Sequence, residues 1–128
     1  MRNKILIVDD VDINREILRS ILEDEYTILE AENGKQALEI VDQEAKNMAA
    51  ILLDLVMPEM DGTQVLEELN RREVIGKVPV LVISGEIIRW RYRRSALSLE
   101  FPILLRSHLT MRLLSRELKI QLNFLIIN

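Results

Sequence analysis

Short apolar runs alternate with longer segments whose apolar residues recur at helical spacing through the first two thirds of the chain. The apolar runs are Lys4–Val8, Tyr26–Ala31, Ala49–Leu53 and Val78–Ile83. Lys4–Val8 and Ala49–Leu53 lack polar alternation, which is typical of strands buried on both faces of a parallel sheet. We therefore interpret the four runs as strands.

The segments between these runs have the apolar spacing of three amphipathic helices. The apolar positions are Ile13, Ile17, Leu18, Ile21 and Leu22 in the first, Ala37, Leu38, Ile40, Val41 and Ala45 in the second, and Val65, Leu66 and Leu69 in the third. Asp10 or Asp12 is available as N-cap of the first helix, and Asn33 with Gly34 predicts a turn before the second. Strands alternating with helices of this length form right-handed βαβ units, so we expect a parallel α/β sheet.

The bulk properties indicate one globular domain. The chain has 128 residues, 48% hydrophobic and 30% charged, enough for one core but too short for two ordinary ones. The absence of cysteine excludes disulfides, thiolate zinc sites and cysteine nucleophiles. The first apolar run meets acidic residues at once and is too short for a signal peptide or a spanning helix. We therefore expect a cytoplasmic protein without membrane contact.

Polar side chains end three of the four predicted strands. Asp9 and Asp10 follow the first, Asp54 the third and Ser84 the fourth. Ligands of open parallel sheets bind beyond the carboxyl ends of the strands, and carboxylates gathered there repel one another unless a cation lies among them. Oxygen ligands without His or Cys select a hard ion, for which Mg²⁺ is the natural choice. Simple capping and turn roles would explain any one of these residues, but they explain the set poorly.

Three segments extend this pattern to a known family. They are Ile5–Asp10, Leu53–Gly62 and Pro79–Gly85. In order and spacing they resemble the corresponding segments of response-regulator receiver domains of two-component systems, and the resemblance covers residues 3–85 continuously. It implies a flavodoxin-like, doubly wound α/β fold with strand order 2-1-3-4-5 and an active site at the carboxyl ends of the strands.

The resemblance also implies roles for individual residues. Asp54 would be the phosphoacceptor and, with Asp10, a direct Mg²⁺ ligand. Asp9 would act mainly through metal-bound water, the backbone carbonyl of Val56 would be a further ligand, and Ser84 would be the switch hydroxyl. A metal neutralises charge on a transferred phosphoryl group, which lets a carboxylate attack it. We therefore expect a signalling switch phosphorylated by a histidine kinase or phosphotransfer protein, with weak self-dephosphorylation at most and no metabolic enzyme activity.

Residues 86–128 depart from the family pattern. They hold 8 Lys and Arg against 3 Asp and Glu, whereas residues 1–85 hold 9 against 18. A receiver domain needs a further strand ending in Lys-Pro, and the only lysine of the tail is Lys119. Arg106 is nearest the expected place, but a planar guanidinium is a poor substitute for a point charge. Phe101–Leu105 offers a substitute strand, and without the proper last strand and helix we expect exposed apolar surface and lower stability.

The tail looks like a frame-shifted reading of the C-terminal end of the family. When each third base is read with the first two bases of the next codon, Leu99–Thr110 permits Gly-Val-Ser-Asp-Ile-Ile-Thr-Lys-Pro-Phe-Asp. That run supplies the missing strand with its Lys-Pro. We therefore hypothesise a one-base deletion near the codon of Glu86. The basic and aromatic residues of the tail would then be accidents of the wrong frame, so we predict no direct nucleic-acid contact.

The whole chain, residues 1–128, is interpreted as a single receiver domain, well matched over 1–85 and atypical over 86–128. Two other functions remain open. One is a Mg²⁺-dependent phosphatase with an aspartate nucleophile, although such enzymes usually carry a second acid where Val56 stands. The other is a receiver-derived interaction module impaired in phosphorylation, because the tail lacks the lysine. A homodimer, or an output domain outside this chain, is compatible with the sequence.

Overall fold

The computed structural model describes residues 3–54, 62–74, 77–84, 87–94 and 97–104. Its elements, in chain order, are β1 (Lys4–Val8), α1 (Asp12–Leu22), β2 (Thr27–Ala31), α2 (Gly34–Glu44), the 3-10 helix η1 (Ala45–Asn47), β3 (Met48–Asp54), α3 (Gly62–Arg71), β4 (Val80–Ser84), β5 (Ile87–Arg94) and β6 (Leu97–Leu104). The four strands and three helices expected up to residue 84 are therefore all present, with bounds shifted by a few residues.

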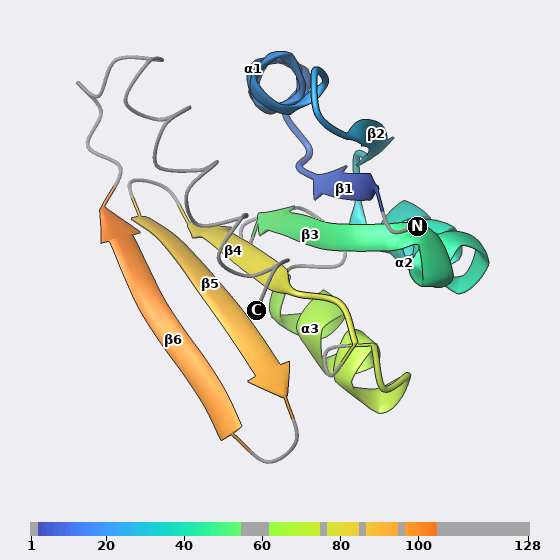
Figure 1. The fold of residues 1–128 in the computed structure, drawn as a ribbon, viewed down its shortest axis with the longest axis vertical. Helices are drawn as coiled ribbons and strands as arrows, with labels where there is room; N and C mark the ends of the chain where they lie inside the picture. The colour runs from blue at the N-terminus through green and yellow to red at the C-terminus, as the bar shows by residue number, and fades with distance from the viewer. Residues whose placement is uncertain (1–2, 55–61, 75–76, 85–86, 95–96, 105–128) are drawn as a thin grey trace.

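One sheet runs through the described part of the chain in the order β2-β1-β3-β4-β5-β6 (Figure 1). The pairings among β1, β2, β3 and β4 are parallel. Val8 pairs with Ala31 on one side and Leu53 on the other, and Asp54 pairs with Ile83. This register places the carboxyl ends of the parallel strands at one edge. It confirms the expected flavodoxin-like α/β sheet as far as β4.

The strand beside β4 is antiparallel, so the parallel fifth strand that the family resemblance implies, and that the atypical tail put in doubt, is replaced here by a hairpin. Ser84 pairs with Ile87 and Val80 with Arg91, which means that β5 turns straight back along β4. A parallel neighbour requires a crossover of about a dozen residues or more, and only residues 85–86 separate β4 from β5. So short a link allows β5 to pair with β4 only as an antiparallel hairpin.

The sequence of β5 suits this hairpin. Isoleucine and aromatic residues alternate with arginines along much of Ile87–Arg94, which is a pattern of period two typical of strands. β6 then pairs antiparallel with β5 and contains most of the substitute strand expected at Phe101–Leu105. Arg106 lies outside the described residues.

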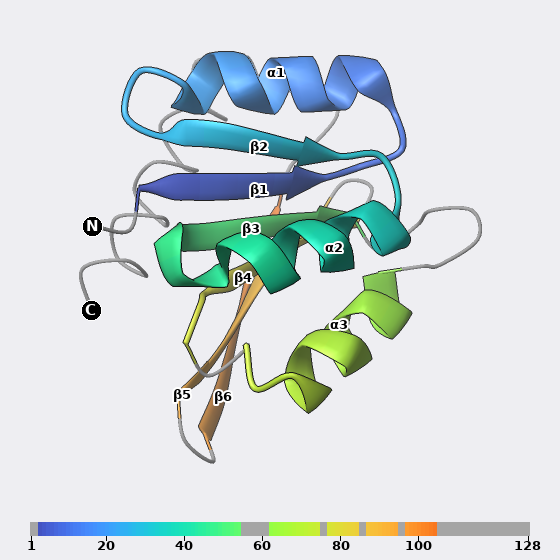
Figure 2. The same cartoon turned by 90° about the vertical axis from the view of Figure 1, so that its right-hand side faces the viewer.

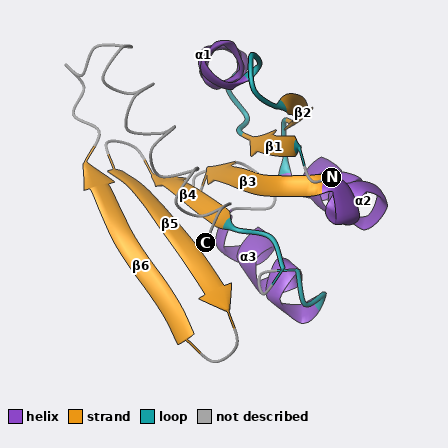
Figure 3. Ribbon diagram, in the orientation of Figure 1, coloured by secondary structure: helices purple, strands orange, loops and turns teal. Residues whose placement is uncertain are grey.

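Helices cover both faces of the parallel part of the sheet (Figures 1 and 2). α1 lies on one face, and α2 with α3 lies on the other, as the colouring by secondary structure also shows (Figure 3). Successive β1 side chains alternate between the two layers, because Ile5 and Ile7 pack with α1 while Leu6 and Val8 pack with α2 and α3. No described helix has the length and apolar character needed to cross a membrane.

The core is made almost entirely of aliphatic side chains. Its largest fully buried members are Ile5, Leu6, Ile7, Leu22, Met48, Ile51, Leu52, Leu53, Leu69 and Leu81. Each such side chain contributes about 1.5–3 kcal/mol relative to exposure, so β1 and β3, which are buried on both faces, anchor the fold. Asp9 and Asp10 directly follow β1, and Asp54 ends β3, so the predicted acidic site lies at the ends of these two strands.

Asn33 lies in the predicted turn before α2 and acts as the N-cap of that helix. The Asn33 side chain accepts a hydrogen bond from the backbone N–H of Gln36 at 2.8 Å. The Gln36 side chain in return accepts from the backbone N–H of Glu32 at 3.0 Å. These reciprocal bonds are a variant of the capping box, and they fix where α2 leaves the end of β2.

The end of α3 is closed by a residue in the left-handed region. Glu73 has a φ of 61°. The N–H of Glu73 donates to the carbonyl of Asn70 at 3.1 Å, and the N–H of Val74 donates to that of Leu69 at 2.9 Å. This pair of bonds defines a Schellman motif, in which glycine is the usual residue at the position occupied by Glu73.

Candidate functional site

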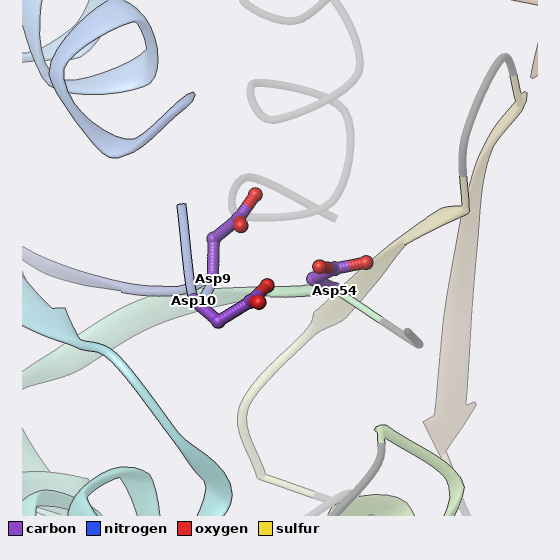
Figure 4. A group of neighbouring side chains, drawn as sticks. All are labelled: Asp9, Asp10 and Asp54. Carbon is purple, nitrogen blue, oxygen red and sulfur yellow. The ribbon is translucent and has the colours of Figure 1, made fainter. Parts of the chain in front are cut away.

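Three carboxylates from two neighbouring strands meet at the carboxyl edge of the sheet. Asp9 and Asp10 follow β1, and Asp54 is the last residue of β3. Each offers an oxygen atom, and these oxygens all lie within 4.8 Å of one another (Figure 4). The meeting follows from the register, because parallel strands end on the same side and β1 lies directly beside β3.

Asp9 is the deepest member of this group, with 4% of its surface exposed. Its backbone N–H donates to the carbonyl of Ala31 at 3.1 Å, which extends the pairing of β1 with β2 by one residue. Its carboxylate accepts from the backbone N–H of Val11 at 2.9 Å. The burial of the Asp9 carboxylate is therefore supported by a hydrogen bond to the next turn of chain.

The first helix begins differently from the sequence-based prediction. Val11 is the N-cap residue of α1 and provides no side-chain cap, whereas Asp10 or Asp12 was expected there. The carboxylate of Asp12 instead pairs with the guanidinium of Arg15. Asp10 is left exposed at the edge of the sheet. For Asp12 the prediction failed because its carboxylate pairs with Arg15 inside the helix, a contact that competes with capping.

The donor set suits a hard divalent cation. Among the described residues the group consists of carboxylate oxygens alone, which are ligands that Mg²⁺ prefers. Mg²⁺ binds oxygen at about 2.0–2.1 Å, so ligands on opposite sides of the ion are about 4.2 Å apart. The oxygens of Asp9, Asp10 and Asp54 span up to 4.8 Å. A contraction of a few tenths of an ångström, or one water between ion and carboxylate, brings them into range.

Of the remaining predicted site residues, the structure describes the backbone of Ser84 but not Val56 or Arg106. Ser84 is the last residue of β4 and follows Ile83, whose backbone pairs with Asp54, so its Cα lies at the same edge as the acids. The position of its hydroxyl lies outside what the structure describes. Val56 and Arg106 also lie outside the described residues.

One residue beside the acids was missed by the sequence reasoning. Arg15 on α1 donates to the backbone carbonyl of Asp9 at 2.6 Å and to the carboxylate of Glu30 at 3.3 Å. Its only signal in the sequence is a cation one helical turn after Asp12, which is a common surface pattern. The contact with Asp9 arises from the loop geometry and could not be foreseen.

Comparison with known proteins agrees with this geometry. Residues 5–100 match the family model of the response regulator receiver domain. The chain is 42% identical over 87 residues to the transcriptional regulatory protein SrrA of Staphylococcus aureus, an alignment covering 67% of this chain and 34% of SrrA. The chain therefore spans about a third of the length of the curated relatives it matches.

Solved structures give the same picture. The N-terminal domain of a response regulator receiver protein from Methanoculleus marisnigri JR1 is 30% identical, with a TM-score of 0.57 over 64% of this chain and 66% of that one. The signal receiver domain of a Luxo repressor protein from Vibrio parahaemolyticus has a TM-score of 0.69 over 99% of this chain and 95% of that one. At 18% identity the second likeness concerns the fold alone. The chain belongs to the response regulator receiver domain family, whose members serve as phosphoacceptors in two-component signalling.

Proposed function

We propose that Asp54 is the residue of this chain that accepts the phosphoryl group. The observation that carries the proposal is the meeting of the Asp54 carboxylate with those of Asp9 and Asp10 within 4.8 Å. Asp54 is half-buried at the end of a central strand, whereas Asp9 is buried. A nucleophile must reach its substrate, and Asp54 combines a fixed backbone position with partial exposure.

The proposed reaction is an in-line transfer from phosphohistidine. An Asp54 carboxylate oxygen forms a bond to phosphorus as the P–N bond of the donor breaks, and the imidazole nitrogen that leaves takes up a proton. The product is an acyl phosphate on Asp54. Bound Mg²⁺ would neutralise charge on the transferred group. Asp10 and Asp54 would hold the ion directly, and Asp9 would do so mainly through water.

Further roles follow from the family and from the backbone positions. We propose Ser84 as the switch hydroxyl that bonds a phosphoryl oxygen, since β4 ends beside β3. We propose the backbone carbonyl of Val56 as a further Mg²⁺ ligand. Arg106 is the nearest cation in the sequence to the missing lysine. These assignments make phosphate transfer to Asp54, with slow hydrolysis at most, the chemistry of the chain.

The setting of this chemistry is also proposed. Residues 1–128 would form one receiver domain, with 86–128 as its atypical part. The donor would be a histidine kinase or a phosphotransfer protein in the cytoplasm. A homodimer or an output domain beyond this chain would receive the signal, since SrrA is a transcriptional regulatory protein longer than the matched segment. We expect neither nucleic acid nor membrane to bind the chain directly.

A small acyl-phosphate donor with Mg²⁺ tests the proposal without a known kinase. Intact-mass analysis should show one added phosphoryl group on the wild type and on Asp24→Asn, which removes an exposed acid away from the site. Asp54→Asn should show none. Equal labelling of Asp54→Asn would refute the assignment. Turnover of a phosphate ester that survives Asp54→Asn would favour the phosphatase alternative.

A further inference from the structure

Arg15 connects the acid-bearing loop to the second strand of the sheet. Its guanidinium donates to the backbone carbonyl of Asp9 at 2.6 Å, and its Nε donates to the carboxylate of Glu30 at 3.3 Å. It also pairs with the carboxylate of Asp12. Only 12% of the Arg15 side chain is exposed. A planar fork of five N–H donors suits such multiple contacts, whereas lysine presents a single charged centre.

The contact with Asp9 acts on the peptide that joins two site residues. The Asp9 carbonyl belongs to the peptide bond between Asp9 and Asp10, so its direction fixes where Asp10 begins. The N–H of Asp9 is bound to Ala31 and its carboxylate to the N–H of Val11. With Arg15 on the carbonyl, every polar group of Asp9 has a described partner.

The far end of the connection is itself held in place. Glu30 belongs to β2, where its backbone pairs with Ile7 of β1. Its second carboxylate oxygen accepts from Arg19 at 3.1 Å. Glu30 therefore receives one arginine on each oxygen. Arg15 bonds both this carboxylate and the Asp9 carbonyl. The position of the loop after β1 therefore depends on β2 as well as on α1.

Arg15 acts on the acidic site by positioning the Asp9–Asp10 peptide rather than by adding positive charge to the site. The guanidinium is paired with the carboxylates of Asp12 and Glu30, so its positive charge is largely compensated locally. Arg19 carries the same charge on the same helix and shares Glu30, but it pairs with Glu23 rather than with the loop. A charge effect would be shared by both arginines, while a positional effect belongs to Arg15.

We propose that Arg15 is a positioning residue that sets the Asp9–Asp10 peptide for metal binding. The proposal rests on the proposed function of the acid group as a Mg²⁺ site, and it assigns Arg15 no contact with the ion. Outer residues that orient metal ligands typically change metal affinity by about 10–100-fold when removed. The loss expected here is at the lower end, because the carboxylates themselves remain.

The test compares Arg15→Gln with the matched control Arg19→Gln in the full chain. Titration with Mg²⁺ should give a dissociation constant raised about tenfold for Arg15→Gln and within about twofold of wild type for Arg19→Gln. Arg15→Lys should recover part of the loss, since one ammonium donor can still reach the Asp9 carbonyl. Unchanged affinity in Arg15→Gln, or equal losses in both variants, would overturn the proposal.

A measurement without metal separates this proposal from the function it rests on. Amide exchange at Val11, whose N–H is bound to the Asp9 carboxylate, should accelerate in metal-free Arg15→Gln and change clearly less in Arg19→Gln, which leaves the contact of Arg15 with Asp9 in place. If the wild type binds Mg²⁺ but is not phosphorylated, the function of Asp54 fails and the role of Arg15 stands. If Arg15→Gln does not fold, Glu30→Gln should weaken Mg²⁺ binding by a smaller factor, and unchanged binding there would overturn the proposal.

Discussion

The carboxylates of Asp10 and Asp54 approach within 4.8 Å of each other, although one follows the first strand of the chain and the other ends the third. Two like charges at such a separation near a protein surface repel by about 1 kcal/mol or more. This repulsion opposes folding, and a cation bound between the carboxylates would offset it. We therefore expect metal binding at these carboxylates to stabilise the fold.

Neutralising one of these acids should stabilise the metal-free chain. We expect Asp10→Asn to raise the free energy of unfolding in EDTA by about 1 kcal/mol, because one repulsion is removed. The same variant should lose most of the stabilisation that added Mg²⁺ gives the wild type. Thermal melts with EDTA and with Mg²⁺ measure both effects. Asp24→Asn should change neither, and a metal-free Asp10→Asn less stable than wild type would contradict the account.

Glu73 should be a site where glycine stabilises the chain. It holds a φ of 61° at the end of α3, and the left-handed conformation costs a residue with a Cβ about 1–2 kcal/mol. Glu73→Gly should therefore raise the free energy of unfolding in urea by about 1 kcal/mol. Glu67→Gly, at an exposed position inside α3, should lower it by about the same amount. If both variants changed the free energy of unfolding in the same direction, the φ of Glu73 would not be what reduces stability at this position.

Stability should fall as the pH drops below the ordinary range of glutamate. Hydrogen bonds from Arg71 and then Arg72 hold the pKa of Glu68 below its ordinary value of 4.5. A group whose pKa is lowered by folding stabilises the fold above its unfolded pKa, and that contribution is lost as pH falls through the folded pKa. Glu68→Gln should therefore reduce the fall of Tm between about pH 5 and pH 3. Glu67→Gln is the control, and an identical slope in Glu68→Gln and wild type would reject the prediction.

The frame-shift hypothesis makes its own prediction about the tail. A chain whose residues from 87 onward follow the shifted frame should regain a fifth parallel strand and the Lys-Pro at its end. We expect it to melt more cooperatively and at higher temperature than the printed chain. Acyl phosphate should also label it at least about tenfold faster, because a charged donor to the phosphoryl group is worth about 1.5–3 kcal/mol. Equal stability and labelling would remove the reason for the hypothesis, as would a nucleotide sequence without Lys-Pro in that frame.

The sequence predicts the parallel sheet because each strand carries its own evidence. Residues such as Leu6 and Leu52 lie in unbroken apolar runs, and buried runs of that kind have few alternatives to a central parallel strand. The order of the strands followed from the family resemblance rather than from local pattern. The placement of Asp9 and Asp54 at one edge then required only that β1 and β3 be neighbours.

The sequence-based predictions fell short where side-chain contacts, or the length of the link between two strands, determine the local structure. Asn33 was predicted in a turn, but its capping role was not foreseen because its bond to Gln36 depends on the helix that follows. The antiparallel β5 follows from the two-residue link after Ser84, which leaves no room for a crossover. Arg15 was overlooked because its partner is a backbone carbonyl, and no pattern of side-chain types marks such a contact.

Locating the phosphoryl group is the most direct test of the central claim, which is that Asp54 is the phosphoacceptor. The chain would be treated with a small acyl phosphate and Mg²⁺, reduced with borohydride to convert an aspartyl phosphate into homoserine, and mapped by peptide mass. We predict reduction at Asp54 that depends on Mg²⁺ and disappears with Asp10→Asn. Labelling at another residue would contradict the claim. So would the absence of label at Asp54 in the chain whose residues from 87 onward follow the shifted frame.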